Sequence, residues 1–207
     1  MSTELDADDR PSFAVALAPA YRLLGELYLH PPTEQTVSAI QEWCRALPGE
    51  SLPSDIEDAA GTILAAETEL ETLCGAFTRL LQGVSYGDST PPPYESMYVD
   101  GMLNGPSSTE VDAFYLEAGV KLAVDDELID HAGYELLFLA TLCEHGDERR
   151  QFGFITTHVG DWLGAFHEQA LESDPPEFYR GVFALTESLL DLHAQTLEET
   201  ASWGGEN

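Results

Sequence analysis

The sequence has very few basic residues. Its 207 residues include 8 Lys plus Arg against 38 Asp plus Glu, which gives a formal net charge of −30 at pH 7. The single lysine is Lys121, and Arg149 and Arg150 form the only adjacent pair of cations. Proteins that bind the phosphates of nucleic acids need clustered Lys and Arg. The composition therefore argues against nucleic-acid binding.

Patterns of a disulfide framework, a zinc site and a membrane-directed segment are also absent. The three cysteines, Cys44, Cys74 and Cys143, have no C-x-x-C spacing, which is typical of reduced thiols in the cytosol. The first ten residues are acidic and lack the apolar core of a signal peptide. No apolar run approaches the ~20 residues that span a bilayer. We therefore expect a cytoplasmic protein that does not insert into a membrane.

The acidic residues are spread along the whole chain, so the charge is a property of the entire surface. Such a chain repels itself at low ionic strength, whereas at ~1 M salt the Debye length falls to roughly 3 Å and screens that repulsion. The composition is typical of a cytosolic protein from a halophile. Because halophilic adaptation alone produces it, the charge says nothing about a cationic partner.

The hydrophobic pattern predicts helices along most of the chain, with apolar residues at three- and four-residue steps between proline and glycine breaks. The predicted segments are 13–29, 36–47, 54–81, 109–122, 131–144, 150–171 and 176–200. Gly61 and Gly75 interrupt 54–81, which can be two helices in line. Segment 131–144 is hydrophobic nearly all round, as in a central buried helix. No strand alternation of useful length occurs, so we predict an all-α bundle of about eight helices.

The least helical stretch is 83–106, which contains three consecutive prolines from Pro91 to Pro93. A run of prolines favours extended polyproline II geometry. Loops this long are usually functional or disordered, and the tyrosines in this one argue against disorder. We expect a single domain over 1–207, with a mobile acidic N-terminus over 1–12 and the 83–106 loop packed onto the body.

Signals of catalysis or metal binding are weak. His131 and Glu135 lie four residues apart on one helix and could ligate a metal or act in catalysis. Alternatively, Asp130 caps that helix and the two residues form a hydrogen-bonded pair. The other histidines form no paired motif, and neither a nucleophile elbow nor a P-loop occurs. We therefore expect no enzyme, no metal and no cofactor, and keep a metal-binding protein or enzyme that uses His131 and Glu135 as the alternative function.

The segment after the prolines is more informative. Prolines followed by Tyr94, Glu95 and Ser96 form a stiff stretch that presents the aromatic ring in a defined direction. Such a stretch can be a packed crossover between two helical halves. It can also be a wall of a groove in which rigid aromatics and a carboxylate meet a peptide.

Three motifs in this order resemble the TorD/DmsD/NarJ family of cytoplasmic maturation chaperones for molybdenum-containing oxidoreductases. They are Phe-Thr-Arg-Leu-Leu-Gln-Gly at 77–83, Pro-Pro-Tyr-Glu-Ser-Met-Tyr at 92–98, and Asp-His-x-x-x-Glu-Leu-x-Phe-Leu at 130–139. Weaker similarity covers 154–166 and 178–190. The resemblance implies an all-helical fold, which is monomeric or a domain-swapped dimer.

The resemblance also implies a function. Such a chaperone binds the twin-arginine leader, or a terminal segment, of a molybdoenzyme catalytic subunit, assists molybdopterin insertion and delays export. Carried over by motif, the peptide-binding residues are Pro93, Tyr94, Asp130 and His131, with Phe77, Leu80 and Leu81 as additions. The motif residues expected to be structural are Glu95, Ser96, Tyr98 and Glu135. Tyr94 stands where tryptophan is frequent and Leu81 where phenylalanine is common, and both changes keep an apolar surface.

A physical hypothesis follows from these residues. The apolar stretch of the leader would lie against Tyr94, Phe77 and Leu80, while Asp130 and nearby acids would pair with the arginines. In molar salt, long-range attraction is screened, so close contacts and buried apolar area would hold the peptide.

Overall fold

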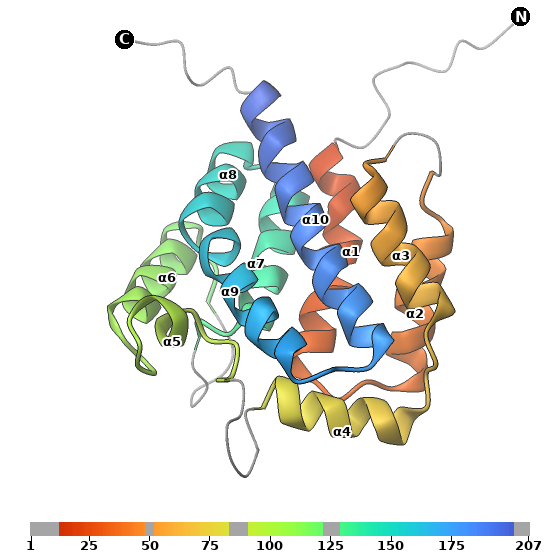
Figure 1. Ribbon diagram of the computed structural model, residues 1–207. Coiled ribbons are helices and arrows are strands. Elements are labelled where there is room, and N and C mark those ends of the chain that lie inside the picture. The colour runs from red at the N-terminus through yellow and green to blue at the C-terminus, as the bar shows by residue number, and fades with distance from the viewer. Residues whose placement is uncertain (1–12, 49–51, 83–90, 122–128, 201–207) are drawn as a thin grey trace, which may run out of the picture.

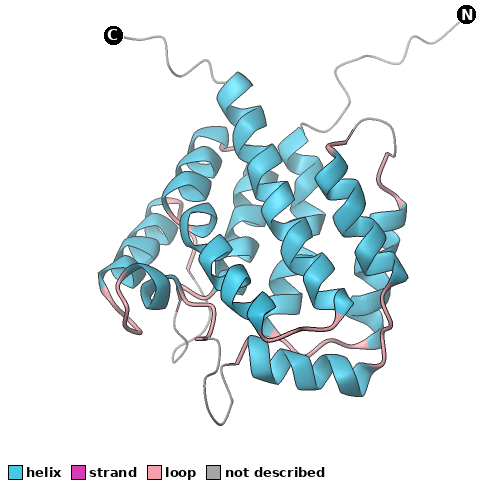
Figure 2. Ribbon diagram, in the orientation of Figure 1, coloured by secondary structure: helices cyan, strands magenta, loops and turns pink. Residues whose placement is uncertain are grey.

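The computed structural model describes residues 13–48, 52–82, 91–121 and 129–200, and all regular secondary structure within these ranges is helical (Figure 2). The described helices are α1 (Phe13–Leu29), α2 (Glu34–Arg45), α3 (Ser54–Ala65), α4 (Leu70–Leu80), α5 (Glu95–Val99), α6 (Pro106–Glu117), α7 (Ala132–His145), α8 (Glu148–Thr157), α9 (Val159–Glu172) and α10 (Glu177–Thr200). The all-α prediction is confirmed. The acidic segment 1–12 and residues 83–90 of the proline-rich loop lie outside the described residues.

The differences from the predicted helices have local causes. Segment 54–81 does divide in two, but the break is at 66–69, where Ala66 takes an extended conformation, and Gly61 and Gly75 lie inside α3 and α4. The predicted helix 150–171 divides at His158, whose non-helical backbone ends α8 and begins α9. The short helix α5 lies inside the predicted loop. Because of these breaks, the described residues form more helices than the eight or so that the pattern predicts.

Helices α1 and α7 form the most extensive helix pair in the described chain and lie side by side in Figure 1. Two glycines allow this close approach. A Cβ atom on Gly25 would lie 2.9 Å from the carbonyl oxygen of Gly133, and one on Gly133 would lie 2.8 Å from the carbonyl oxygen of Gly25. Both distances are too short for real contacts, so the backbones pack directly against each other. The prediction that segment 131–144 is central and buried agrees with this packing.

Two tyrosines of α1 connect it to the C-terminal helices by hydrogen bonds. The Tyr21 hydroxyl lies 3.1 Å from Nδ1 of His193, and the Tyr28 hydroxyl lies 2.6 Å from Nε2 of His167. Burial raises the pKa of both tyrosines and lowers the pKa of both histidines. Each pair is therefore uncharged at neutral pH. The hydrogen bond within each pair offsets the free-energy cost of burying its polar groups in the core.

The remaining elements lie around this core. Helix α4 runs across one end of the bundle, and α5 and α6 lie on the flank beside α8 and α9 (Figure 1). No helix within the described ranges combines the length and the apolar character needed to cross a membrane. The arrangement brings the end of α1, the end of α4, the proline-rich segment and the start of α7 to one place.

Candidate functional site

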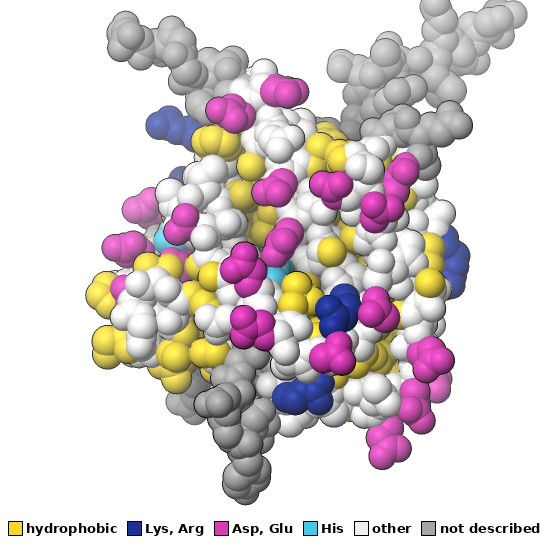
Figure 3. All heavy atoms as spheres, in the orientation of Figure 1, with side chains coloured by type: hydrophobic (Ala, Val, Ile, Leu, Met, Phe, Trp, Pro, Cys, Tyr) yellow, Lys and Arg dark blue, Asp and Glu magenta, His cyan; other side chains and the backbone are white. Residues whose placement is uncertain are grey.

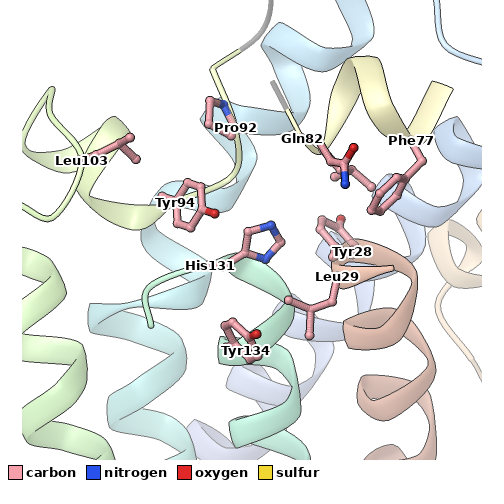
Figure 4. Close-up of a pocket in the computed structure, with 10 residues that line it drawn as sticks. Tyr28, Leu29, Phe77, Gln82, Pro92, Tyr94, Leu103, His131 and Tyr134 are labelled. Atoms are coloured by element: carbon pink, nitrogen blue, oxygen red, sulfur yellow. The ribbon is translucent and has the colours of Figure 1, made fainter. Parts of the chain in front are cut away.

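A cavity of about 460 Å³ lies where these four segments meet (Figure 4). The residues that line it are Tyr28, Leu29, Phe77, Leu81, Gln82, Pro92, Tyr94, Leu103, His131 and Tyr134. Eight of these ten residues are aromatic or aliphatic, but polar atoms make up the larger part of the accessible lining, and they include tyrosine hydroxyls, one amide and one imidazole. A concave site that combines aromatic and aliphatic residues with a few placed polar groups is the usual form of a binding site.

Backbone hydrogen bonds fix the proline-rich wall to the start of α7. The amide of Ala132 donates to the carbonyl oxygen of Pro93 at 2.9 Å, and the amide of Glu95 donates to the carbonyl oxygen of Asp130 at 2.9 Å. Proline has no N–H group, so this segment takes part mainly through its carbonyl oxygens. The two bonds flank an isolated antiparallel bridge between Tyr94 and His131. The wall is therefore held in a defined register.

The bridge places the rings of Tyr94 and His131 edge to face, with centroids 5.0 Å apart at an interplanar angle of 79° (Figure 4). His131 is also the N-cap of α7, because its Nδ1 accepts a hydrogen bond of 3.0 Å from the amide of Gly133. The ring also interacts with the backbone of Leu81, and this hydrogen bond acts to raise the pKa of His131 against the larger effect of burial. One imidazole thus connects the ends of α4 and α7 with the proline-rich wall.

The described residues that line the cavity are uncharged at neutral pH. Burial lowers the pKa of His131 to about 4, so its ring is neutral. None of the other described residues that line the cavity is Asp, Glu, Lys or Arg. This absence is unusual in a chain with a formal net charge of −30, and acidic side chains are scattered over the face drawn in Figure 3. The described lining of the site differs in this respect from the face drawn in Figure 3, where acidic side chains are exposed.

Four of the residues predicted for peptide binding line the cavity together: Phe77, Leu81, Tyr94 and His131. Three do not. Pro93 is buried behind its neighbour Pro92, which does line the cavity, and Leu80 is buried in the core. Asp130, the third, has no exposed surface.

The burial of Asp130 contradicts the hypothesis that it pairs with an incoming arginine. Its Oδ2 accepts from the amide of Ser96 at 2.9 Å, and its Oδ1 lies 3.2 Å from the Ser108 hydroxyl, which donates to it. Each oxygen of the carboxylate therefore accepts a hydrogen bond from within this chain. Its position assigns it to the support of the wall, behind the binding surface.

The motif residues expected to be structural also lie behind the wall. The hydroxyl of Tyr98 donates to the carbonyl oxygen of Pro91 at 2.8 Å, and its ring stacks on Trp162 with centroids 5.5 Å apart. The Ser96 hydroxyl accepts from the amide of Asn104 at 3.1 Å. Glu95 and Glu135 are buried.

The alternative interpretation of the Asp-His motif is wrong in its details. His131, not Asp130, provides the side-chain cap of α7. Glu135 does not pair with His131, because its Oε2 accepts from Nε1 of Trp162 at 3.1 Å. Among the described residues, no group of three or more His, Cys, Asp and Glu lies close enough to hold a metal ion. The part of the chain that the structure describes therefore supplies no further ligands for a site at His131 and Glu135.

Six residues of the cavity were not predicted from the sequence: Tyr28, Leu29, Gln82, Pro92, Leu103 and Tyr134. For three of them a signal existed. Pro92 and Gln82 lie within or beside the family motifs, and Tyr134 is one helical turn from His131. Tyr28, Leu29 and Leu103 are brought in only by tertiary packing.

The fold and the cavity define an all-helical binding protein, and comparison with known proteins gives its family. The family model described as nitrate reductase delta subunit matches residues 33–168. The chaperone protein TorD of Shewanella pealeana is 27% identical over 202 residues, which cover 86% of this chain and 88% of the relative. The Tat proofreading chaperone DmsD of Salmonella paratyphi A is 28% identical over 187 residues, covering 88% and 87%.

The fold is also that of a solved structure. A crystal structure described as a redox enzyme maturation protein from Archaeoglobus fulgidus covers 94% of this chain and 99% of its own, with a TM-score of 0.55 and 18% identity. The chain belongs to the nitrate reductase delta subunit family, in which TorD and DmsD are its relatives. The predicted family is thereby confirmed, and the relatives are named as chaperones and not as enzymes.

Proposed function

We propose that this chain is a cytoplasmic chaperone that binds the twin-arginine leader, or a terminal segment, of a molybdoenzyme catalytic subunit, assists insertion of the cofactor and delays export. The family and the names of its relatives support the class of function. The observation that carries the proposal is the uncharged cavity between Tyr94, Phe77 and His131 in an otherwise acidic protein.

The absence of charge in the cavity selects the part of the peptide that enters. An arginine there would lose its hydration without gaining a carboxylate partner, which is costly. An apolar side chain would instead contact aromatic and aliphatic walls and gain about 25 cal/mol for each Å² of apolar surface removed from water. The apolar stretch of the leader therefore occupies the cavity. The arginines stay outside it, near exposed acids whose attraction is largely screened in molar salt.

Calorimetric titration with twin-arginine leader peptides from the same organism's molybdoenzymes, in molar potassium chloride, tests the proposal. We expect micromolar binding of at least one leader. Replacing leucines of its apolar stretch with serine should weaken binding more than replacing both arginines with glutamine. The same titration with terminal peptides of the mature subunits covers the other form of client. No binding to any of these peptides would overturn the proposal.

Two leucines provide a matched pair of variants. Leu103 lines the cavity and is 46% exposed, whereas Leu171 at the end of α9 is 38% exposed and lies outside it. Leu103→Ala should weaken binding severalfold, and Leu171→Ala should leave it unchanged. Tyr94→Ala should weaken it by about tenfold or more, as expected for an aromatic anchor in an interface. Equal effects of the two leucine variants would show that the peptide binds elsewhere.

A further inference from the structure

Three carboxyl groups are buried together behind the wall of the cavity. Their residues are Glu95, Asp130 and Glu135, with 2%, 0% and 0% of their surface exposed. Within the described part of the chain, one basic side chain forms an ion pair with them: Nδ1 of His158 lies 3.1 Å from each carboxylate oxygen of Glu95. Three ionised carboxylates with one such partner would be expensive to bury. The free energy of burial therefore depends on which of the three carboxyl groups carries a proton.

The two carboxyl oxygens of Glu135 differ in their hydrogen bonds. Its Oε2 accepts from the indole N–H of Trp162 at 3.1 Å. Its Oε1 is fully buried and finds no donor among the described residues. The Glu95 and Glu135 carboxyl groups are nevertheless close enough to interact, and a hydrogen bond between them would raise the pKa of Glu135 and act to lower that of Glu95. Two carboxylates cannot bond to each other, because neither has a proton to donate.

A single proton resolves both problems. If one of the two carboxyl groups is protonated, the contact becomes an O–H···O⁻ hydrogen bond, which is among the stronger ones in proteins. Glu135 is the better site for that proton. Burial raises the pKa of both glutamates, but the imidazole of His158 acts to lower that of Glu95, whereas the donor that faces Glu135 is a neutral indole.

We propose that Glu135 carries a proton at neutral pH and donates it to Glu95, and that this pair is the positioning device that fixes the cavity wall on α7. The geometry joins the two sides of the site. Glu95 directly follows Tyr94 on the wall, and Glu135 lies one helical turn after His131 on α7. Asp130 adds a further connection between the start of α7 and the wall, since it accepts a hydrogen bond from the amide of Ser96.

The groups around the pair support this assignment. Burial raises the pKa of Glu135, and the negative charge of Glu95 raises it further. The hydroxyl of Tyr115 on α6 donates to the carbonyl oxygen of Ile129, and burial and the nearby carboxylates raise its pKa, so it contributes no charge. Asp130 adds negative charge from the start of α7 and raises the pKa of both glutamates. His158 lies on the opposite side, between α8 and α9.

Infrared spectroscopy of the free protein in heavy water tests the proton directly. At neutral pH the exposed carboxyl groups are ionised, so a protonated carboxyl group gives a separate carbonyl band. We expect that band in the wild-type protein and its loss in Glu135→Gln, whose amide still donates to Glu95 and accepts from Trp162. Glu172→Gln, at an exposed glutamate of α9, should keep the band. A spectrum without it in the wild-type protein would overturn the proposal.

The pH dependence of unfolding provides a second test. A carboxyl group with a raised pKa in the folded state stabilises the protein fully below its ordinary pKa of about 4.3, and this stabilisation is lost as pH rises towards the raised value. Across that window the unfolding equilibrium constant of the wild-type protein should rise relative to Glu135→Gln by up to about tenfold per pH unit. Profiles of the two proteins that stay parallel would contradict the shared proton.

The link to peptide binding rests on the proposed function and is measured separately. If Glu135 loses its proton at high pH, repulsion between the carboxylates releases the Tyr94 wall, so leader affinity should fall with pH in the wild-type protein and stay level in Glu135→Gln. A leader that binds with the same pH profile to both proteins would remove the positioning role. If no leader binds at all, the proposed function fails, and the infrared and unfolding measurements still decide whether the proton is shared.

Discussion

His131 shows how a single side chain decides the character of the site. The sequence suggested it as a binding residue through its motif, and the structure adds the reason why its ring is neutral. Its Nδ1 caps α7 through the amide of Gly133, and burial lowers its pKa to about 4. Protonation would remove the acceptor from the cap and place a cation in the cavity. Only above that pH can the imidazole both accept the hydrogen bond from Gly133 and line the cavity as a neutral group.

A pH dependence follows from this depressed pKa. A buried histidine with a folded pKa of about 4 stabilises the protein above its ordinary pKa of about 6.5, and this contribution is lost as pH falls towards 4. The loss amounts to about 3 kcal/mol over the window. His131→Asn keeps a helix-capping acceptor but does not titrate. Urea denaturation in molar salt should show a shallower acid loss in this variant, and identical profiles would contradict the assignment.

At the scale of elements, the sequence predicts helices well because their apolar faces repeat at a fixed period. Helix α1 begins and ends where predicted, between Phe13 and Leu29. The break at His158 was not predictable, because the side chain of that residue turns towards Glu95, which lies 63 residues away in the sequence. The predicted binding residues account for four of the ten that line the site, Tyr94 and His131 among them. Tyr28 and Leu103 reach the cavity through packing between distant elements, which has no local signal.

Close helix packing gives a prediction at this scale. In Gly133→Ala the new Cβ would lie 2.4 Å from Cγ of Leu29, which lines the cavity, and 2.8 Å from the carbonyl oxygen of Gly25. Overpacking of this kind costs about 1–3 kcal/mol and exceeds the gain in helix propensity. Chemical denaturation should therefore show a destabilised protein, and leader binding should weaken because Leu29 must move.

Gly75→Ala is the matched control for that substitution. Gly75 lies inside α4, and a Cβ there would meet nothing within 4 Å. Without a steric conflict, alanine should stabilise the helix by about 0.5–1 kcal/mol. A Gly133→Ala protein as stable as Gly75→Ala would mean that α1 and α7 can separate at little cost.

At the scale of the whole molecule, charge acts differently on the surface and on the cavity. The 38 acidic residues face only 8 Lys plus Arg, so few of them can be paired. Arg22 and Glu144 form one two-pronged pair, with distances of 2.8 and 2.6 Å, but it is exposed and worth little. Most of the acidic charge is therefore unpaired and repels itself. The cavity, lined by uncharged groups, is exempt from this effect.

This division predicts the response to salt. On dialysis from molar potassium chloride into dilute buffer, the Debye length grows from roughly 3 Å towards 30 Å, so acids across the whole surface begin to repel one another. We expect circular dichroism to report a loss of helix under these conditions, with restoration when salt is returned. Magnesium chloride at equal ionic strength should restore it as well, because screening and not a specific cation is the cause. An unchanged helix signal in dilute buffer would mean that packing such as that of α1 against α7 outweighs the repulsion of a net charge of −30.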